Sequence, residues 1–433
     1  MNRKERRHDR EIFRLAIPAL AALAADPLYS LIDTAFVGHL GVSQLAALAI
    51  GTAAFTASFW IFSFLAFGVT PRVARAFGAG DRPGADTTGV QALFLAVVLG
   101  AAVTVIGVVF AGPIVRAFGA SDNVAVYAEP YLRIRALAAI PVLIGQVGQG
   151  WMRGMQDTRT PMFVLGAGLL VNTLLNYVLI YPADLGVEGS ALATVIGQGG
   201  VAVAFVILLR RRMTFARWVP DLAVIRGLIR VGLDLVVRTG ALLAAMTVAT
   251  AVAARMGEVT LAAWQIAMQV FLLLAFTLDS LAIAAQAMVG RFLGAVNTAE
   301  AVSVGRRLMR MGVILGVLLF VVLGVSSRWV ARLFTDDGRV ITLAGSLLLW
   351  VAIVQPLSAV AFTLDGILIG ASDTRFLAAA MVASSLVYVA ISLLSLERGW
   401  GVEGLTIAAT SWLMVRSLTT GTRFIRGRWA LQT

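Results

Sequence analysis

Asp33 is the residue whose type and position most clearly indicate chemistry. It lies in an apolar segment, residues 17–39, that is long enough to cross a bilayer, which takes about 20 residues. A carboxylate inside a membrane is costly unless it faces a protein interior or an ion pathway. Removal from water favours the neutral acid, so Asp33 could bind and release a proton. In the competing interpretation, Asp33 lies near the outer end of its span and is wetted.

Several other residues of the N-terminal half could act together with Asp33. Pro18 removes a backbone hydrogen bond from the first helix and predicts either a mobile bend or a static kink. Asn172 and Asn176 are four residues apart and therefore share one helix face. We expect Tyr29 and both asparagines to line a cavity in this half. The alternative is that the asparagines only link helices through hydrogen bonds.

The C-terminal half has two more carboxylates within apolar segments, Asp279 and Asp365. They predict negative potential in a pocket that binds organic cations, with Gln265 and Gln286 as neutral partners. A structural network of buried acids and glutamines is the alternative, because buried polar groups need hydrogen-bond partners.

The sequence contains no set of residues typical of an enzyme or a metal centre. It has no cysteine and only 2 histidines, which excludes disulfides, thiolate chemistry and zinc-type Cys or His clusters. We find no nucleophile with a neighbouring histidine. We therefore expect no catalytic residue, no bound metal and no cofactor, the coupling ion being a proton or, alternatively, sodium.

Composition identifies a polytopic membrane protein. Hydrophobic residues make up 59% of the chain and charged residues only 13%, about half the share in soluble proteins. The net charge of +12 comes from basic residues concentrated in alternate short loops, as the positive-inside rule predicts, so it does not indicate nucleic-acid binding. We expect both termini in the cytoplasm and the protein in the inner membrane.

Apolar runs predict an all-α protein with about twelve transmembrane helices. Their starts fall near residues 12, 44, 88, 124, 160, 188, 226, 260, 302, 340, 376 and 402. The sequence also repeats. Arg291 lies 216 positions after Arg75, and the Asp-Thr-Arg sequence at 157–159 recurs at 373–375.

The repeat predicts two six-helix lobes in the same orientation, related by a pseudo-two-fold axis along the membrane normal. We place the N-lobe at residues 1–209, a cytoplasmic linker at 210–225 and the C-lobe at 226–433. A binding site is expected between the lobes, as in other transporters built from repeats.

The segments described so far resemble the multidrug and toxic compound extrusion (MATE) family, in its DinF-like branch. The resemblance extends over nearly the whole chain, and its motifs are specific in combination. They are Pro18 and residues 31–41 (LIDTAFVGHLG), 154–159 (GMQDTR), 186–194 (GVEGSALAT) and 364–370 (LDGILIG).

The resemblance implies alternating access and export of organic cations in exchange for protons or sodium. Asp33 matches the family's protonated acid in the first helix, and Pro18 matches its bend point. Asn176 stands where the family often has a second acid, which weakens a sodium site in the N-lobe. We expect a monomeric, proton-coupled exporter of amphipathic cations. A lipid-linked saccharide flippase and a sodium-coupled exporter are the alternatives.

The predicted topology can be tested by cysteine labelling, because the chain has no native cysteine. A cysteine introduced at Gly41, in the first outer loop, should react with an impermeant maleimide from outside the cell. Labelling only from the cytoplasmic side would contradict the topology.

Overall fold

The computed structural model describes residues 3–62, 64–216 and 218–431, which are helical throughout with short connections and contain no strand. This confirms the predicted all-α fold class. The helices of the N-terminal half are α1 (Arg3–Leu23), α2 (Ala25–Val37), α3 (Val42–Phe62), α4 (Phe64–Gly78), α5 (Arg82–Val109), α6 (Ala111–Ala117), α7 (Asp122–Ala136), α8 (Ala139–Gly154), α9 (Arg159–Ile180) and α10 (Gly186–Arg212). Those of the C-terminal half are α11 (Leu222–Arg255), α12 (Glu258–Gly294), α13 (Thr298–Arg332), α14 (Gly338–Gly370), α15 (Thr374–Arg398) and α16 (Gly401–Ile425), followed by the short 3₁₀-helix η1 (Arg428–Leu431).

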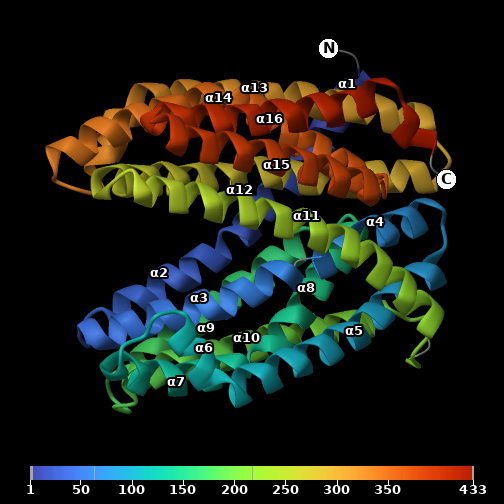
Figure 1. The fold of residues 1–433 in the computed structure, drawn as a ribbon. Helices are drawn as coiled ribbons and strands as arrows, with labels where there is room; N and C mark the ends of the chain where they lie inside the picture. Colours follow the sequence, from blue (N-terminus) through green and yellow to red (C-terminus); the bar gives the residue numbers. More distant parts are fainter. Residues whose placement is uncertain (1–2, 63, 217, 432–433) are drawn as a thin grey trace. The chain divides into compact units, whose positions relative to one another are not determined.

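The helix boundaries repeat with the period found in the sequence. The interval that separates Arg75 from Arg291 also separates the start of α3 from the start of α12, and the end of α4 from the end of α12. In the same way, α14 corresponds to α7 and α8 together. One half therefore has continuous helices where the other half has pairs of shorter ones, as Figure 1 shows for α7 and α8.

Among the described residues, nine helical segments are long and apolar enough to cross a membrane. The pair α7 and α8, which is bent by 46°, makes up to ten. The segments α3–α4 and α16 do not pass this test, but their repeat counterparts α12 and α10 do. The repeat therefore accounts for twelve spans, the number expected from sequence.

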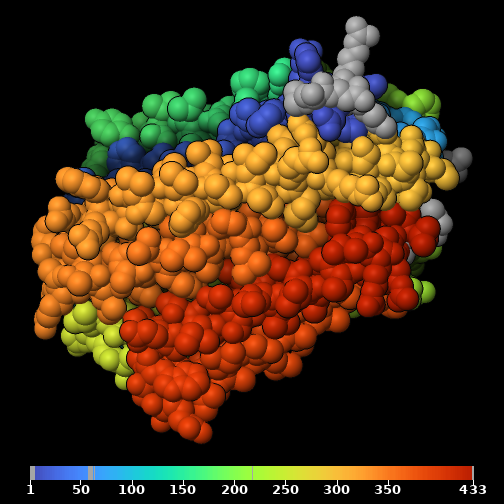
Figure 2. Space-filling model, turned by 90° about the horizontal axis from the view of Figure 1, so that it is seen from above, coloured from blue at the N-terminus to red at the C-terminus, as the bar shows by residue number. Residues whose placement is uncertain are grey.

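The chain divides into two compact units. One unit contains residues 17–232, and the other contains residues 233–433 together with residues 1–16. Residues 3–16, which the sequence analysis assigns to the N-lobe, thus pack with the C-terminal helices. Within the C-terminal unit, α13 runs along an outer face (Figure 2) and exposes large apolar side chains such as Val325 and Trp329, as expected for contact with lipid.

Ion pairs explain why the N-terminal segment belongs to the C-terminal unit. The guanidinium of Arg307 on α13 donates two hydrogen bonds of 2.6 Å to the carboxylate of Asp9. Further pairs join His8 to Glu300 at 2.7 Å, and Glu11 to Arg291. The α1 helix continues past the buried Pro18, and the interruption comes at Ala24, between α1 and α2. The bend at Pro18 stays a prediction.

Asp157 and Asp373, which are equivalent in the repeat, each tie the start of a helix to the last long helix of the same half. Asp157 accepts a 2.7 Å hydrogen bond from Arg212, and Asp373 accepts one of 2.7 Å from Arg423. Burial alone would raise the pKa of Asp157, but bonds from Arg212 and Thr160 outweigh it and lower the pKa. This contact therefore stabilises the fold at neutral pH and is lost as the pH falls below about 3.9.

The core of the C-terminal unit depends on close contact between α12 and α14. A Cβ atom at Gly366 on α14 would lie 2.5 Å from both the Cα atom and the carbonyl oxygen of Ala282 on α12. Backbone atoms cannot move aside as a flexible side chain can, so only glycine allows the two helices to pack at this distance.

We expect Gly366→Ala to destabilise the protein by about 1–3 kcal/mol, because the added methyl group overpacks the α12–α14 contact. The measurement is the thermal unfolding midpoint in detergent. Gly324→Ala on α13 is the matched control, since a Cβ atom there meets nothing within 4 Å. A Gly366→Ala protein as stable as the control would refute the packing argument.

Candidate functional site

Asp33 lies at the centre of a buried polar network within the N-terminal unit. The side chain is 4% exposed and projects from α2 toward α9 and α10. The Nδ2 group of Asn176 donates a 2.8 Å hydrogen bond to Oδ1 of Asp33. The hydroxyl of Thr194 lies 3.3 Å from Oδ2. The structure therefore places Asp33 in the protein interior, not at a wetted helix end.

The two asparagines form a chain that continues this network. Asn176 also donates from Nδ2 to Oδ1 of Asn172 at 3.1 Å, and Asn172 donates from Nδ2 to the Thr194 hydroxyl at 3.3 Å. Asp33, Asn172 and Asn176, which sequence reasoning selected, thus lie together. Thr194 belongs to the segment 186–194, and nothing else in its sequence neighbourhood indicates that it contacts Asp33.

The hydroxyl of Thr194 has one proton and two acceptors within reach. The carbonyl oxygen of Ser190 is 3.1 Å away, and Oδ2 of Asp33 is 3.3 Å away. A hydroxyl can donate only one hydrogen bond of this kind. If it donates to Ser190, the contact with Asp33 is satisfied when the acid is protonated and donates to Thr194. The geometry accommodates a neutral Asp33.

Tyr29 is one helical turn before Asp33 on α2 and is 4% exposed. Its hydroxyl makes no hydrogen bond to the described part of the chain, and it lies 2.8 Å from where a Cβ atom at Gly168 would be. The absence of a side chain at Gly168 leaves room for this ring between α2 and α9.

Arg135 on α7 is a charged neighbour that sequence reasoning missed. Its guanidinium lies 4.7 Å from the ring centre of Phe55, and its Nε and Nη1 atoms are buried without a hydrogen bond to any described residue. The positive charge lies within electrostatic range of Asp26 and Asp33, which are both on α2. An arginine near a helix end usually extends to the membrane surface, so its sequence position gave no reason to select it.

In the C-terminal unit, Asp365 on α14 lies between two arginines. Its Oδ2 atom accepts a 2.6 Å hydrogen bond from Arg416 on α16 and another from Arg238 on α11. The three residues carry a net positive charge, so the negative potential expected from Asp365 is outweighed locally. The predicted role of Asp365 in binding cations stays a prediction.

The structure does not bring the other C-terminal candidates into one pocket. Asp279, Gln265 and Gln286 all lie on α12, where Gln265 is exposed, Asp279 is half-buried and Gln286 is buried. The two glutamines are 21 residues apart. At 1.5 Å per residue this is about 32 Å along the helix, so they cannot both neighbour one acid. The predicted role of Gln265 and Gln286 as neutral partners of Asp279 and Asp365 in a cation pocket stays a prediction.

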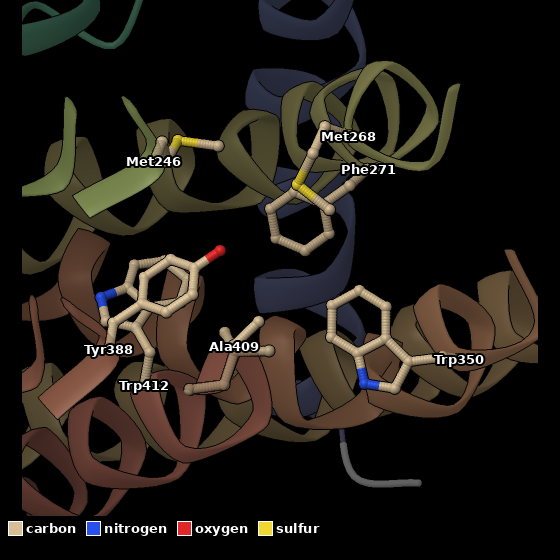
Figure 3. Close-up of a pocket in the computed structure, with 8 residues that line it drawn as sticks. Met246, Met268, Phe271, Trp350, Tyr388, Ala409 and Trp412 are labelled. Carbon is tan, nitrogen blue, oxygen red and sulfur yellow. The ribbon is translucent and has the colours of Figure 1, made fainter. Parts of the chain in front are cut away.

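The described cavity in the C-terminal unit is lined by aromatic and methionine side chains. Figure 3 shows Trp350, Tyr388 and Trp412 facing Met246, Met268 and Phe271. Its volume of about 20 Å³ has room for a water molecule but not for a drug. None of the residues that the sequence analysis assigns to a site lines it.

Comparisons with known proteins agree with this architecture. A family model described as MatE matches residues 18–178 and, separately, residues 241–394. The chain is 34% identical to Protein DETOXIFICATION 44, chloroplastic, of Arabidopsis thaliana, over 86% of this chain and 74% of the relative. It is 28% identical to DNA damage-inducible protein F of Escherichia coli, over 95% of this chain and 91% of the relative.

A solved structure described as MATE in the bent conformation has the same fold. The TM-score is 0.89 at 22% identity, and the match covers 99% of this chain and 97% of the other. This likeness shows that the helices are arranged alike in the two proteins.

We expect Arg135→Gln to change the protonation midpoint of Asp33, because the substitution removes a positive charge within electrostatic range of the carboxyl group. Infrared difference spectra of the carboxyl stretch, assigned with Asp33→Asn, would measure the midpoint. Arg133→Gln is the control, because Arg133 lies on the same helix but pairs with Glu129 near the surface. Equal midpoints in both variants would show that Arg135 does not act on Asp33.

Proposed function

Because the chain belongs to the MATE family and is therefore a transporter and not an enzyme, we propose that it exports organic compounds in exchange for protons bound at Asp33. The observation that carries the proposal is the buried network in which Asp33 meets Asn176 and Thr194. When a buried carboxyl group binds a proton, it loses its negative charge. The hydrogen bonds that it makes with Asn176 and Thr194 then change.

A proton fits this site better than sodium does. Sodium requires several oxygen ligands converging on one point. Here the Nδ2 group of Asn176 points at Asp33. The next amide has a matching orientation: Asn172 donates a hydrogen bond to Thr194 and accepts one from Asn176. A sodium site would need these amides to turn, whereas a proton needs only the carboxyl oxygen beside Thr194.

Protonation changes the hydrogen bonds that hold α2 against α9 and α10. The bond from Asn176 loses its charge assistance when Asp33 becomes neutral, and charge-assisted bonds are about twice as strong as neutral ones. The position of α2 therefore depends on the proton. If the two states of the transporter bind the proton unequally, a proton gradient shifts their populations and drives export.

The sequence analysis predicts amphipathic, mostly cationic organic compounds as substrates. We propose that the exported compounds are amphipathic. The aromatic and methionine residues around Tyr388 and Trp412 support an apolar contact surface in the C-terminal unit. Asp365 gives the cationic preference no support, because Arg238 and Arg416 outweigh its charge. A lipid-linked saccharide flippase is not favoured, since the matched family is the MATE family.

We expect Asp33→Asn to abolish substrate uptake into inverted vesicles whose interior is more acidic than the outside. Equilibrium binding of substrate should persist. Asparagine keeps the shape of aspartate but cannot exchange a proton. Asp184→Asn is the matched control, because Asp184 is exposed in the α9–α10 connection. Undiminished proton-driven uptake by Asp33→Asn, or uptake driven by sodium and indifferent to pH, would refute the proposal.

A further inference from the structure

We call the cluster of Arg238, Asp365 and Arg416 the arginine triad. It contains two positively charged side chains and only one negatively charged side chain. Both guanidinium groups bond to Oδ2 of Asp365. Three guanidinium nitrogens, Nε and Nη1 of Arg416 and Nε of Arg238, are buried and make no hydrogen bond to any described residue, against one such oxygen, Oδ1 of Asp365. Arg416 is 2% exposed. Buried donors of this kind are normally paired, so the triad retains unused capacity to bind an anionic group.

The shared architecture of the two halves does not explain the triad. The positions of the N-terminal half that correspond to Arg238 and Arg416 in the repeat hold Ala22 and Val201. One guanidinium would suffice to compensate Asp365, and a second buried cation adds a desolvation penalty. A charge inside a membrane protein that the fold does not require indicates a binding function.

The surroundings of Arg416 suit an aromatic ligand with a negative group. Its guanidinium lies 4.9 Å from the ring centre of Phe362 and 5.2 Å from that of Trp412. Trp412 also lines the cavity shown in Figure 3, next to Tyr388. Methionine side chains such as Met268 on the opposite wall adapt to different shapes, so the small cavity could widen around an apolar body.

We propose that the arginine triad binds the carboxylate of amphipathic organic anions or zwitterions, whose apolar body packs in the aromatic cavity beside Trp412. Arg238, whose side chain is 17% exposed, is the accessible edge of this site. Two guanidinium groups match the geometry of a carboxylate, which can accept a pair of hydrogen bonds from each. The inference rests on the proposed function as an exporter and specifies a substrate class for it.

The test measures equilibrium binding of two fluorescent probes with the same ring system and opposite charge, 1-pyrenebutyrate and 1-pyrenebutylammonium. The protein is placed in nanodiscs of phosphatidylcholine without a pH gradient. We expect Arg238→Gln to weaken binding of pyrenebutyrate at least tenfold and to leave the ammonium probe within twofold. Arg238→Lys keeps the charge but loses the paired donors, so it should weaken binding of pyrenebutyrate less than Arg238→Gln does. Asp365→Asn should strengthen binding severalfold by removing the competing carboxylate. Arg255→Gln, at the exposed end of the same helix, is the control.

Equal changes for both probes in Arg238→Gln would show that the triad is structural and would overturn the inference. Weaker pyrenebutyrate binding in Asp365→Asn would also overturn it, because the site would then need the acid and not the surplus charge. Competition by phosphatidylglycerol but not by benzoate would assign the triad to a lipid headgroup. Asp33→Asn should bind both probes normally, so failure of the triad and failure of proton coupling give different results.

Discussion

The constraint on which the rest of the structure depends is that a bilayer offers no water to a buried polar group. Helices satisfy their own backbone, so the polar side chains between them must find partners within the protein. In the N-terminal unit this requirement joins α2, α9 and α10 through one carboxyl group, two amides and a hydroxyl group. In the C-terminal unit it joins α11, α14 and α16 through one carboxyl group and two guanidinium groups.

The two halves share helix boundaries but differ in chemistry. Each half builds an interior polar network on an aspartate, Asp33 or Asp365, and the two acids occupy positions that do not correspond in the repeat. The acid of the N-terminal unit is hydrogen-bonded to neutral groups, Asn176 and Thr194. The acid of the C-terminal unit accepts hydrogen bonds from two guanidinium groups. A duplicated scaffold thus carries two polar interiors of different charge.

The sequence predicted the scaffold well because its signals are local and repeated. Apolar runs of fixed length locate spans, and one constant interval relates Arg75 to Arg291 and α3 to α12. It also identified Asp33, Asn172 and Asn176, since a polar residue in an apolar run stands out. It did not identify Arg135, Arg238 and Arg416 as partners of those acids. Each of these arginines lies far along the chain from the acid it affects, and side-chain direction is set by packing that sequence spacing does not show.

The N-terminal segment has a consequence for the biogenesis of the protein. Its residues Glu11 and Asp9 leave the ribosome well before their partners Arg291 and Arg307, which follow 280 and 298 residues later. Asp9 and Glu11 therefore lack their arginines until most of the chain has been synthesised. Contacts between such distant segments form late, because closing a long loop costs entropy before the contact contributes stability. The start of the chain is thus among the last parts of the C-terminal unit to reach its native place.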